Sequence, residues 1–421
     1  MREGAARPEV PQPDARAAER YLLGLELFGM RFGLDRIRRL LCALNSPQQR
    51  YETIHVVGSN GKSSTMRMIA ALLAGHGRRV GAYTSPHLVS FCERIQVDGR
   101  DLDPSRFAAG VAAAARAASL VDRTLAADDR VTQFEALTAA AYFELAAAGV
   151  DVAVVEAGLG GRYDATNVIA SRVQVLTNVG LEHTRWLGPT IKDIAREKLD
   201  VVQPGAAVVI GEDLHPEALA VAEEIAGQRG ARLVRAPELA PGSGHLSAAG
   251  AYQRRNFALA SAAAEAFLGA PVELAAVEAA TSLELPGRFQ LLDERTLLDG
   301  AHNPAGIAAL AESVPGWAAG RRVTAVVSIL DDKDAAAMLR VLLGVCAELI
   351  CTSASNPRAL SPATLASLAA QLGAADVCVE PDPRRALSLA RKNSGVVLAT
   401  GSMYLISDLL RPASAGPGSM L

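Results

Sequence analysis

The sequence has few of the features that mark secreted, disulfide-bonded or membrane proteins. Its 421 residues include only five cysteines, an odd number, and no CxxC pair. A disulfide scaffold or a zinc cluster is therefore not expected, and the cysteine pattern fits a reducing cytosol. No run of about 18 apolar residues occurs, so no membrane-spanning helix is expected. We predict a cytoplasmic protein.

The chain also lacks an excess of either charge. Its formal net charge is −3 and 21% of its residues are charged. This balance argues against binding to nucleic acid or to an anionic membrane, although a local basic site for a small anion remains compatible with it. Half of the residues are hydrophobic, enough to bury the cores of two or three domains of about 150 residues. We expect a monomer.

Short apolar runs rich in β-branched residues alternate with helical patterns along the whole chain. The runs are IHVV (54–57), DVAVVEAG (151–158), VQVLTNVG (173–180), AAVVIGE (206–212), TLLDGAHNP (296–304), VTAVVSIL (323–330), AELICTSAS (347–355) and VVLATGS (396–402). This alternation predicts an α/β protein with mostly parallel sheets and helices on both faces.

The runs form two series, which meet at a Pro-Gly turn signal after an Ala-rich helical stretch, 257–280. We therefore predict two domains between disordered tails. The predicted limits are 1–18 for the first tail, 19–286 and 287–412 for the domains, and 413–421 for the last tail.

A glycine-rich loop follows the first apolar run and opens a predicted helix. It consists of Gly58, Ser59, Asn60, Gly61, Lys62, Ser63 and Ser64. Backbone N–H groups of such a loop and the helix N-terminus bind phosphate, and the lysine reaches the β- and γ-phosphates. The loop is shorter than the general Walker A pattern, because Val56 stands where that pattern has its first glycine. A plain glycine turn is the alternative.

Three charged or titratable residues after later apolar runs are candidates for a metal site, and the residues alone favour only the first. Glu156 ends the run 152–155, where an acid beside a phosphate loop can hold Mg²⁺. A second glycine-rich loop, 158–167, follows, and a flexible surface loop is its alternative interpretation. His183 alone is more typical of a structural histidine, because Mg²⁺ prefers oxygen ligands. Lys198 lies in a charged helical segment, 193–198, typical of a solvated face.

Twelve segments occur in an ordered series that covers about residues 20–410. They are GSNGKSST, YTSPHL, ERIQVDG, VVEAGLGGRYDATNVI, GLEHTRWLG, IAREK, QRRN, LPGRF, LLDGAHNP, DDKD, NPRAL and TGSMYL. The series resembles the motifs of the folylpolyglutamate and dihydrofolate synthases, a branch of the Mur ligase superfamily. The resemblance implies a larger N-terminal ATP-binding domain of the Mur ligase type and a smaller Rossmann-like C-terminal domain.

The resemblance also implies roles for individual residues. Ser85, Glu156 and His183 would surround Mg²⁺, and Lys198, carbamylated by CO₂, would help to hold a second Mg²⁺. Nucleotide contacts would come from Asn256, Arg288 and Asp299, and catalysis from Lys62, Lys198 and Arg288. The substrate-binding residues would be Thr132, Gln133, Phe134, Glu135, Tyr163, Asp164, Ala165, His302 and Ser402. K⁺ is a further candidate cofactor.

The activity implied is ATP-dependent ligation of L-glutamate to dihydropteroate or to a folate. The chain departs from the usual motifs at Ser59, Ser63, Glu182, Tyr163 and Leu199-Asp200, and Tyr163 bears most on substrate choice. One alternative is another Mur-type ligase, acting on a nucleotide-linked cell-wall precursor. A second is a regulatory ATPase that hydrolyses ATP without forming a bond.

Overall fold

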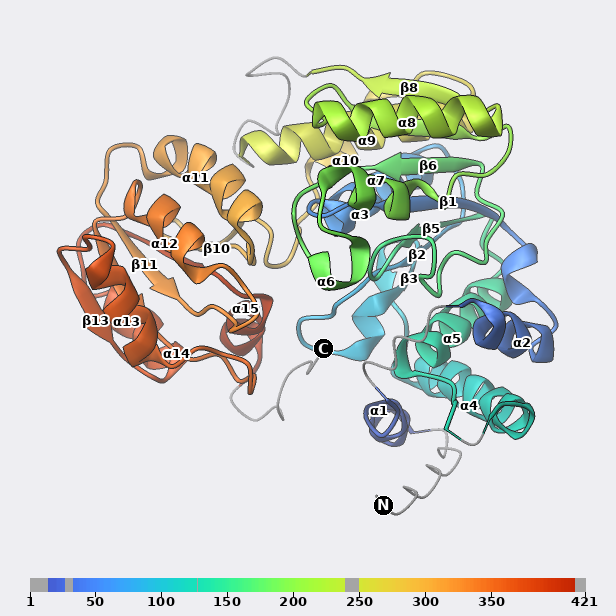
Figure 1. Ribbon diagram of the computed structural model, residues 1–421, viewed down its shortest axis with the longest axis horizontal. Helices are drawn as coiled ribbons and strands as arrows, with labels where there is room; N and C mark the ends of the chain where they lie inside the picture. Colours follow the sequence, from blue (N-terminus) through green and yellow to red (C-terminus); the bar gives the residue numbers. More distant parts are fainter. Residues whose placement is uncertain (1–13, 27–32, 127, 239–249, 413–421) are drawn as a thin grey trace. The chain divides into compact units, whose positions relative to one another are not determined.

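The computed structural model describes residues 14–26, 33–126, 128–238 and 250–412. They divide into two compact α/β units (Figure 1). Within these residues, the first unit comprises 14–26, 33–86, 90–126, 128–238 and 258–280, and the second comprises 87–89, 250–257 and 281–412. Each unit contains one mostly parallel sheet, which confirms the predicted fold class.

The first unit is built on an eight-stranded sheet in the order β4-β3-β2-β5-β1-β6-β7-β8. Its strands are β1 (Glu52–Val57), β2 (Val80–Tyr83), β3 (Ile95–Val97), β4 (Arg100–Asp101), β5 (Val152–Glu156), β6 (Val173–Leu176), β7 (Ala207–Gly211) and β8 (Arg232–Ala236). Six neighbouring strands pair in parallel, in the order β2-β5-β1-β6-β7-β8. Strands β3 and β4 extend the β2 edge of the sheet in antiparallel pairing. The chain order reverses around β1, so the carboxyl end of β1 lies where ligands bind in such sheets.

Helices cover both faces of this sheet. They are α1 (Ala15–Leu23), α2 (Asp35–Ala43), α3 (Lys62–Gly75), α4 (Pro104–Val121), α5 (Gln133–Ala148), α6 (Thr184–Leu187), α7 (Ile191–Leu199), α8 (Pro216–Arg229) and α10 (Leu274–Thr281). Helix α9 (Ala251–Leu268) is divided: its residues to Phe257 belong to the second unit, and those from Ala258 belong to the first. One core joins α1, α2, α4 and α5 to β2, β3 and β5. A second core joins α7 and α8 to β6 and β7.

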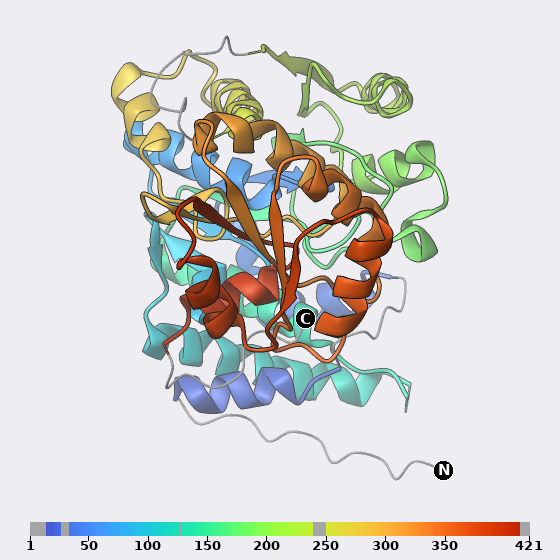
Figure 2. The ribbon, with the colours of Figure 1, turned by 90° about the vertical axis from the view of Figure 1, so that its left-hand side faces the viewer.

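The second unit has a six-stranded sheet in the order β13-β12-β11-β14-β10-β9. Its elements are β9 (Gln290–Asp293), β10 (Thr296–Leu298), α11 (Pro304–Ala318), β11 (Val323–Val327), α12 (Ala335–Leu343), β12 (Glu348–Cys351), α13 (Pro362–Gln371), β13 (Val377–Val379), α14 (Pro383–Ala390), β14 (Val396–Thr400) and α15 (Met403–Leu410). Among the described strands of this sheet, only β9 pairs in antiparallel orientation. Helices α11–α13 pack on one face of the sheet and α14–α15 on the other, as the orange and red ribbon of Figure 2 shows.

The structure differs from the sequence-based expectations at three places. Asp14 caps α1, so residues 15–18, expected in the first tail, are helical; residues 1–13 and 413–421 lie outside the described part. The stretch 257–280 is two helices, because α9 ends before Gly269 (φ +72°) and Pro271 follows. Among the described residues the chain passes between the units at 86/87, 89/90, 257/258 and 280/281, and again between 238 and 250, not at one boundary.

No helix in the described part of the chain combines the length and the apolar character that a membrane crossing requires.

Candidate active site

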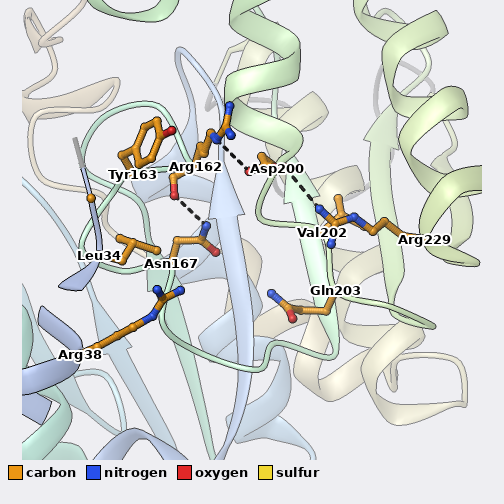
Figure 3. A pocket seen from close by; sticks show the side chains of 10 residues that line it. Leu34, Arg38, Arg162, Tyr163, Asn167, Asp200, Val202, Gln203 and Arg229 are labelled. Carbon is orange, nitrogen blue, oxygen red and sulfur yellow. Dashed lines mark hydrogen bonds and ion pairs between the residues drawn. The ribbon is translucent and has the colours of Figure 1, made fainter. Parts of the chain in front are cut away.

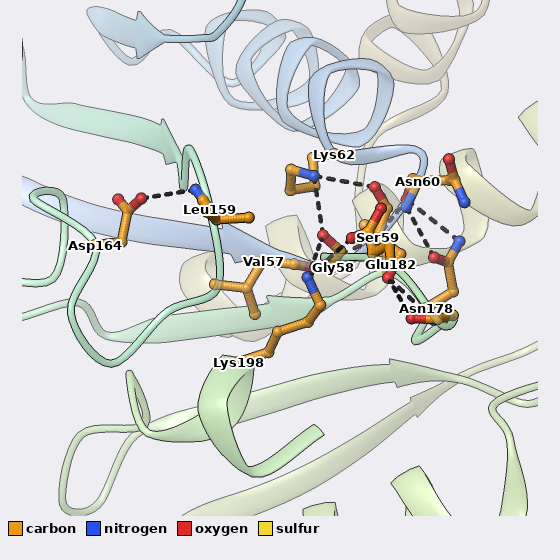
Figure 4. Close-up of polar contacts among 12 residues, drawn as sticks. Val57, Gly58, Ser59, Asn60, Lys62, Leu159, Asp164, Asn178, Glu182 and Lys198 are labelled. Atoms are coloured by element: carbon orange, nitrogen blue, oxygen red, sulfur yellow. Dashed lines mark hydrogen bonds and ion pairs between the residues drawn. The ribbon is translucent and has the colours of Figure 1, made fainter. Parts of the chain in front are cut away.

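The predicted phosphate loop, residues 58–64, connects β1 to α3, which is the expected setting, and its glycines have a structural reason (Figure 4). Gly58 has φ +148°, and a Cβ on it would lie 1.9 Å from the hydroxyl oxygen of Thr177. Gly61 has φ +81° and stands at the N-cap position of α3. Neither backbone conformation suits a residue with a side chain. The loop backbone is therefore open to close approach, and the N-terminus of α3, a feature that favours anions, begins at the end of the loop.

The residues after β6 brace this loop from the neighbouring strand. The side chain of Asn178 accepts from the backbone N–H of Asn60 (2.9 Å) and donates to its carbonyl (3.2 Å). The Asn178 carbonyl accepts from the N–H of Ser59 at 3.0 Å. Thr177 donates its hydroxyl to the Asn60 carbonyl at 2.6 Å. These two loop amides are thus committed to the brace, and the predicted phosphate contacts would fall to the amides that begin α3.

Two lysines converge on the carbonyl of Gly58. Lys62 Nζ donates to it at 2.9 Å and to the Ser59 carbonyl at 3.1 Å. Lys198 Nζ donates to the same Gly58 oxygen at 2.9 Å from α7. Figure 4 shows the two side chains reaching the loop from different directions.

Lys198 is 1% exposed, so the interpretation of 193–198 as a solvated face is wrong for this residue. Burial lowers the pKa of Lys198 to about 8, and the nearby charge of Lys62 acts in the same direction. Its acidic partner is Glu182, whose Oε1 lies 3.3 Å from Nζ. Burial alone would raise the pKa of Glu182, but Lys198, Lys62 and His183 together lower it to about 2. The pair is therefore ionised near neutral pH.

Glu156 gathers oxygen-bearing groups at the carboxyl end of β5. Its side chain is buried, with Oε1 accepting from the Ser63 hydroxyl at 2.9 Å. Oε2 accepts from the Thr84 hydroxyl and, at 3.3 Å, from the backbone N–H of Ser85. Ser85 was predicted here, whereas Thr84 was not. Thr84 follows β2, which pairs with β5 in parallel, so strand adjacency was the signal that could have found it.

A hard divalent cation fits this donor set, because carboxylate and hydroxyl oxygens are the ligands that Mg²⁺ prefers. His183 is exposed, has φ +48° and stands at the N-cap position of α6. Within the described ranges, no three His, Cys, Asp or Glu side chains form a ready metal cluster. A cation beside Glu156 would complete its coordination with hydroxyls, water and the nucleotide, as is usual for Mg²⁺.

The predicted substrate-binding residues of the first unit separate into two kinds. Thr132 and Glu135 form the capping box of α5, and Gln133 donates to the Leu22 carbonyl at 2.8 Å. Their polar groups thus serve the fold. Phe134 is different: a Cβ on Gly158 would lie 2.6 Å from its ring, so Phe134 packs on the second glycine loop.

The loop 163–165 turns one residue outward and two inward. Tyr163 is 39% exposed, whereas Asp164 and Ala165 are buried. Asp164 accepts from the N–H of Leu159 at 2.8 Å and from Thr166 N–H at 3.0 Å, which closes the glycine loop on itself. Burial raises the pKa of this carboxyl group. Asp164 therefore shapes the loop in this structure.

In the second unit the predicted nucleotide residues form one connected group. Asn256 donates to the side chain of Gln253 at 2.9 Å, and Gln253 donates to the carbonyl of Arg288 at 3.4 Å. Buried Asp299 accepts from Tyr252 Oη and, at 2.8 Å, from the N–H of Phe289.

Asp299 also accepts from the N–H of Ala301 at 2.8 Å, and burial raises its pKa. The carboxylate oxygens of Asp299 thus accept backbone hydrogen bonds that stabilise the turn after β10, where a ribose contact was expected. Arg288 donates to its neighbour's carbonyl at 3.3 Å and contacts Met403. His302 Nδ1 lies 2.9 Å from the Gly300 carbonyl oxygen, and Ser402 caps α15. Ligand contacts by these residues stay predictions.

Known proteins resemble this chain along most of its length. The profile of the Mur ligase glutamate ligase domain matches residues 287–403. The dihydrofolate synthase/folylpolyglutamate synthase of Mycobacterium tuberculosis is 35% identical, over 87% of this chain and 85% of that protein. The structure of M. tuberculosis folylpolyglutamate synthase complexed with ADP and AMPPCP gives a TM-score of 0.86 at 33% identity, covering 94% of this chain and 98% of the other.

A bifunctional folylpolyglutamate synthase/dihydrofolate synthase from Yersinia pestis, complexed with AMPPNP and Mn ion, gives a TM-score of 0.80 at 27% identity. It covers 96% of this chain and 99% of the other. This agreement in sequence, fold and length shows that the chain belongs to the dihydrofolate synthase/folylpolyglutamate synthase family of Mur-type ligases.

Proposed function

We propose that this protein uses ATP to join L-glutamate, through an acyl phosphate, to dihydropteroate, to the γ-carboxylate of a reduced folate, or to both. The observation that carries the proposal is the convergence of Lys62, Lys198 and the N-terminus of α3 on one loop. Such a cluster of positive charge suits a nucleoside triphosphate.

The reaction has two steps in this scheme. A carboxylate oxygen of the pteridine substrate attacks the γ-phosphorus of ATP, the bond to the β-phosphate oxygen breaks, and ADP leaves. The amine of glutamate then attacks the acyl carbon, phosphate leaves with the former carboxylate oxygen, and one proton is released. Phosphorylation is needed because a carboxylate by itself is a poor acceptor for an amine.

The protein's part is to position the reactants and stabilise charge. Lys62 and the first amides of α3 would hold the β- and γ-phosphates. Glu156, Ser63 and Ser85 would hold a divalent cation against the nucleotide, and that cation would neutralise negative charge on the phosphates. The relative that binds AMPPNP with a Mn ion supports a divalent cation, and Mg²⁺ and K⁺ stay predictions.

We further propose that Lys198 works as a carbamate. Its neutral amine would attack CO₂, form an N–C bond and release one proton, which turns a cationic donor into anionic oxygen ligands suited to a hard cation. Burial supports this role, because a pKa of about 8 leaves more neutral amine near pH 7 than an exposed lysine has.

The proposal is tested by measuring ADP release with dihydropteroate and with tetrahydrofolate, each with and without glutamate. The molecular mass of the product is measured in the same reactions. ADP release that needs both substrates, with a product heavier by one glutamate residue, is expected. ADP release that needs neither would favour a regulatory ATPase. ADP release only with an amino acid and an acid unrelated to folate would favour another Mur-type ligase.

A further inference from the structure

A pocket of about 440 Å³ opens in the first unit, beside the elements that carry Lys198 and the second glycine loop (Figure 3). It is lined from α2 by Arg38, from the loop after β5 by Arg162 and Tyr163, from the end of α7 by Asp200, and from the end of α8 by Arg229. This volume falls within the range of small-molecule sites, roughly 300–1,000 Å³. We call it the arginine pocket.

The pocket holds more positive than negative charge. Asp200 is the one acidic side chain among the described residues that line it, and it is shared by Arg162 Nε at 3.4 Å and Arg229 Nη2 at 3.3 Å. Both contacts are long for charge-assisted hydrogen bonds, and the two arginine side chains stay 55% and 42% exposed. Their guanidinium groups therefore keep N–H donors for a ligand.

Arg38 adds a third guanidinium group without a compensating acid. In residues 14–26, 33–126, 128–238 and 250–412, no carboxylate lies within ion-pair distance of it. Asn167 and Gln203 line the same pocket as Arg38 (Figure 3). The amide groups of these two neighbours add neutral hydrogen-bonding capacity to the same wall. Three arginines against one aspartate leave the pocket with an excess of two positive charges.

Aromatic packing holds part of this charge in place. The guanidinium carbon of Arg162 lies 5.0 Å from the centre of the Tyr163 ring, a cation–π arrangement. The backbone N–H of Arg162 donates to the Glu197 carbonyl at 2.9 Å, which fixes the loop to α7. A positioned guanidinium group can grip a planar anion through two parallel hydrogen bonds.

We infer that the arginine pocket binds a ligand with two or more carboxylates, the class to which a γ-linked chain of glutamates belongs. The choice of carboxylates over phosphates rests on the proposed function, because each round of glutamate addition adds one carboxylate to the substrate. The pocket would then hold the charged tail of a substrate that already carries glutamates. A surface ion-pair network with no ligand is the competing explanation for these arginines.

Calorimetric titration of the full chain with tri-γ-L-glutamate tests the inference without relying on turnover. Arg38→Gln and Arg229→Gln should each weaken binding at least about tenfold, the scale of a lost charge-assisted hydrogen bond. Asp200→Asn should strengthen binding severalfold, because it removes the one negative charge. Arg235→Gln is the matched control: this exposed arginine pairs with Glu223 at 2.8 Å outside the pocket, and binding should stay unchanged.

The same variants separate this inference from the proposed function. In active enzyme, the KM for a folate with several glutamates should rise in Arg38→Gln and Arg229→Gln, while the KM for ATP stays constant. Peptide affinity equal in wild type and all variants would overturn the inference even if the enzyme ligates glutamate. Binding of pyrophosphate but not of the peptide would overturn the carboxylate assignment. Peptide binding by a chain that shows no ligase activity would contradict the proposed function alone.

Discussion

Lys62 and Lys198 donate to the same carbonyl oxygen, that of Gly58. Two ammonium groups this close repel each other, and Glu182 compensates only one of them directly. A triphosphate would supply the missing negative charge and draw Lys62 away from the loop carbonyls. The two lysines thus leave an excess of positive charge where the nucleotide is expected.

Lys62→Ala should lose at least about 3 kcal/mol of transition-state stabilisation, roughly a hundredfold in kcat/KM, because a key donor to the transferred phosphate is removed. Steady-state ADP-release kinetics measure this directly. Turnover close to wild type in the folded variant would remove Lys62 from the site.

Lys198→Ala should be inactive, and short carboxylates such as acetate should partly restore its activity, since they can replace the oxygens of the proposed carbamate. ADP release at increasing acetate concentration is the measurement. Lys192→Ala is the control, because Lys192 is exposed on the same helix and should tolerate the change. A fully active Lys198→Ala enzyme would refute any role for the residue.

His55 should make the free energy of unfolding decrease as the pH is lowered. It is fully buried in β1, its Nε2 lies 2.8 Å from Thr166 Oγ1, and burial lowers its pKa from 6.5 to about 3. Between these pH values the unfolded chain binds a proton that the folded chain does not, so stability falls as pH falls from 6.5 toward 3.

His55→Gln should remove this dependence, about 1.4 kcal/mol of unfolding free energy per pH unit. Urea unfolding at pH 5.0, 5.5 and 6.0 compares the slopes of variant and wild type. Identical slopes would mean that His55 titrates normally in the folded protein.

At the scale of elements, the site depends on the order of the strands. The loops after β1, β2, β5 and β6 meet because these strands are neighbours in one sheet, in the order β2-β5-β1-β6. Ser63, Thr84 and Glu156 lie far apart in sequence, yet parallel pairing brings them together at one edge. The loops after β1 and β6 pack so closely that an added methyl group on Gly58 would test their contact.

Gly58→Ala should push the phosphate loop away from β6. The new Cβ would lie 1.9 Å from Thr177 Oγ1 at a backbone angle that disfavours side chains. We expect a loss of about 1–3 kcal/mol in stability and a higher KM for ATP. Thermal denaturation and ADP-release kinetics check both.

Two further variants locate the cause. Thr177→Ala should recover part of the loss in the double variant, because it removes the clashing atom. Gly227→Ala, in α8 with no atom near its added Cβ, should be neutral or stabilising. Equal losses at Gly58 and Gly227 would argue against a steric cause.

At the scale of the whole molecule, each unit buries its own apolar core. Leu339→Ala, at a fully buried position of α12, should destabilise the second unit by about 2–5 kcal/mol by leaving a cavity. Hydrogen exchange should then rise in β11, β12 and β14 and stay unchanged in β1 and β5. An equal rise in both units would show that they unfold as one.

The sequence determined the local features of this protein. The strands at 52–57, 152–156 and 396–400 were predictable because buried parallel strands are continuous apolar runs. The glycine-rich loop between β1 and α3 was predictable because its glycines and lysine are adjacent in the chain, and its phosphate contacts stay a prediction. Strands β2, β3, β4, β8, β9 and β13 were not predicted, since β8 contains two arginines and each of the others has at most four residues. The predicted cytoplasmic location and monomeric state stay predictions.

Only the tertiary structure decided which polar groups meet. Lys198 is buried beside Glu182 and Gly58, although the charged sequence of its helix predicts a solvated face. Burial depends on what packs over a helix, which the sequence of the helix does not contain. The tertiary structure also committed Asp164 and Asp299 to backbone amides and gathered three arginines from separate segments around one pocket. A sequence lists such groups in chain order, whereas their electrostatic energies depend on distances through space and on exclusion of water.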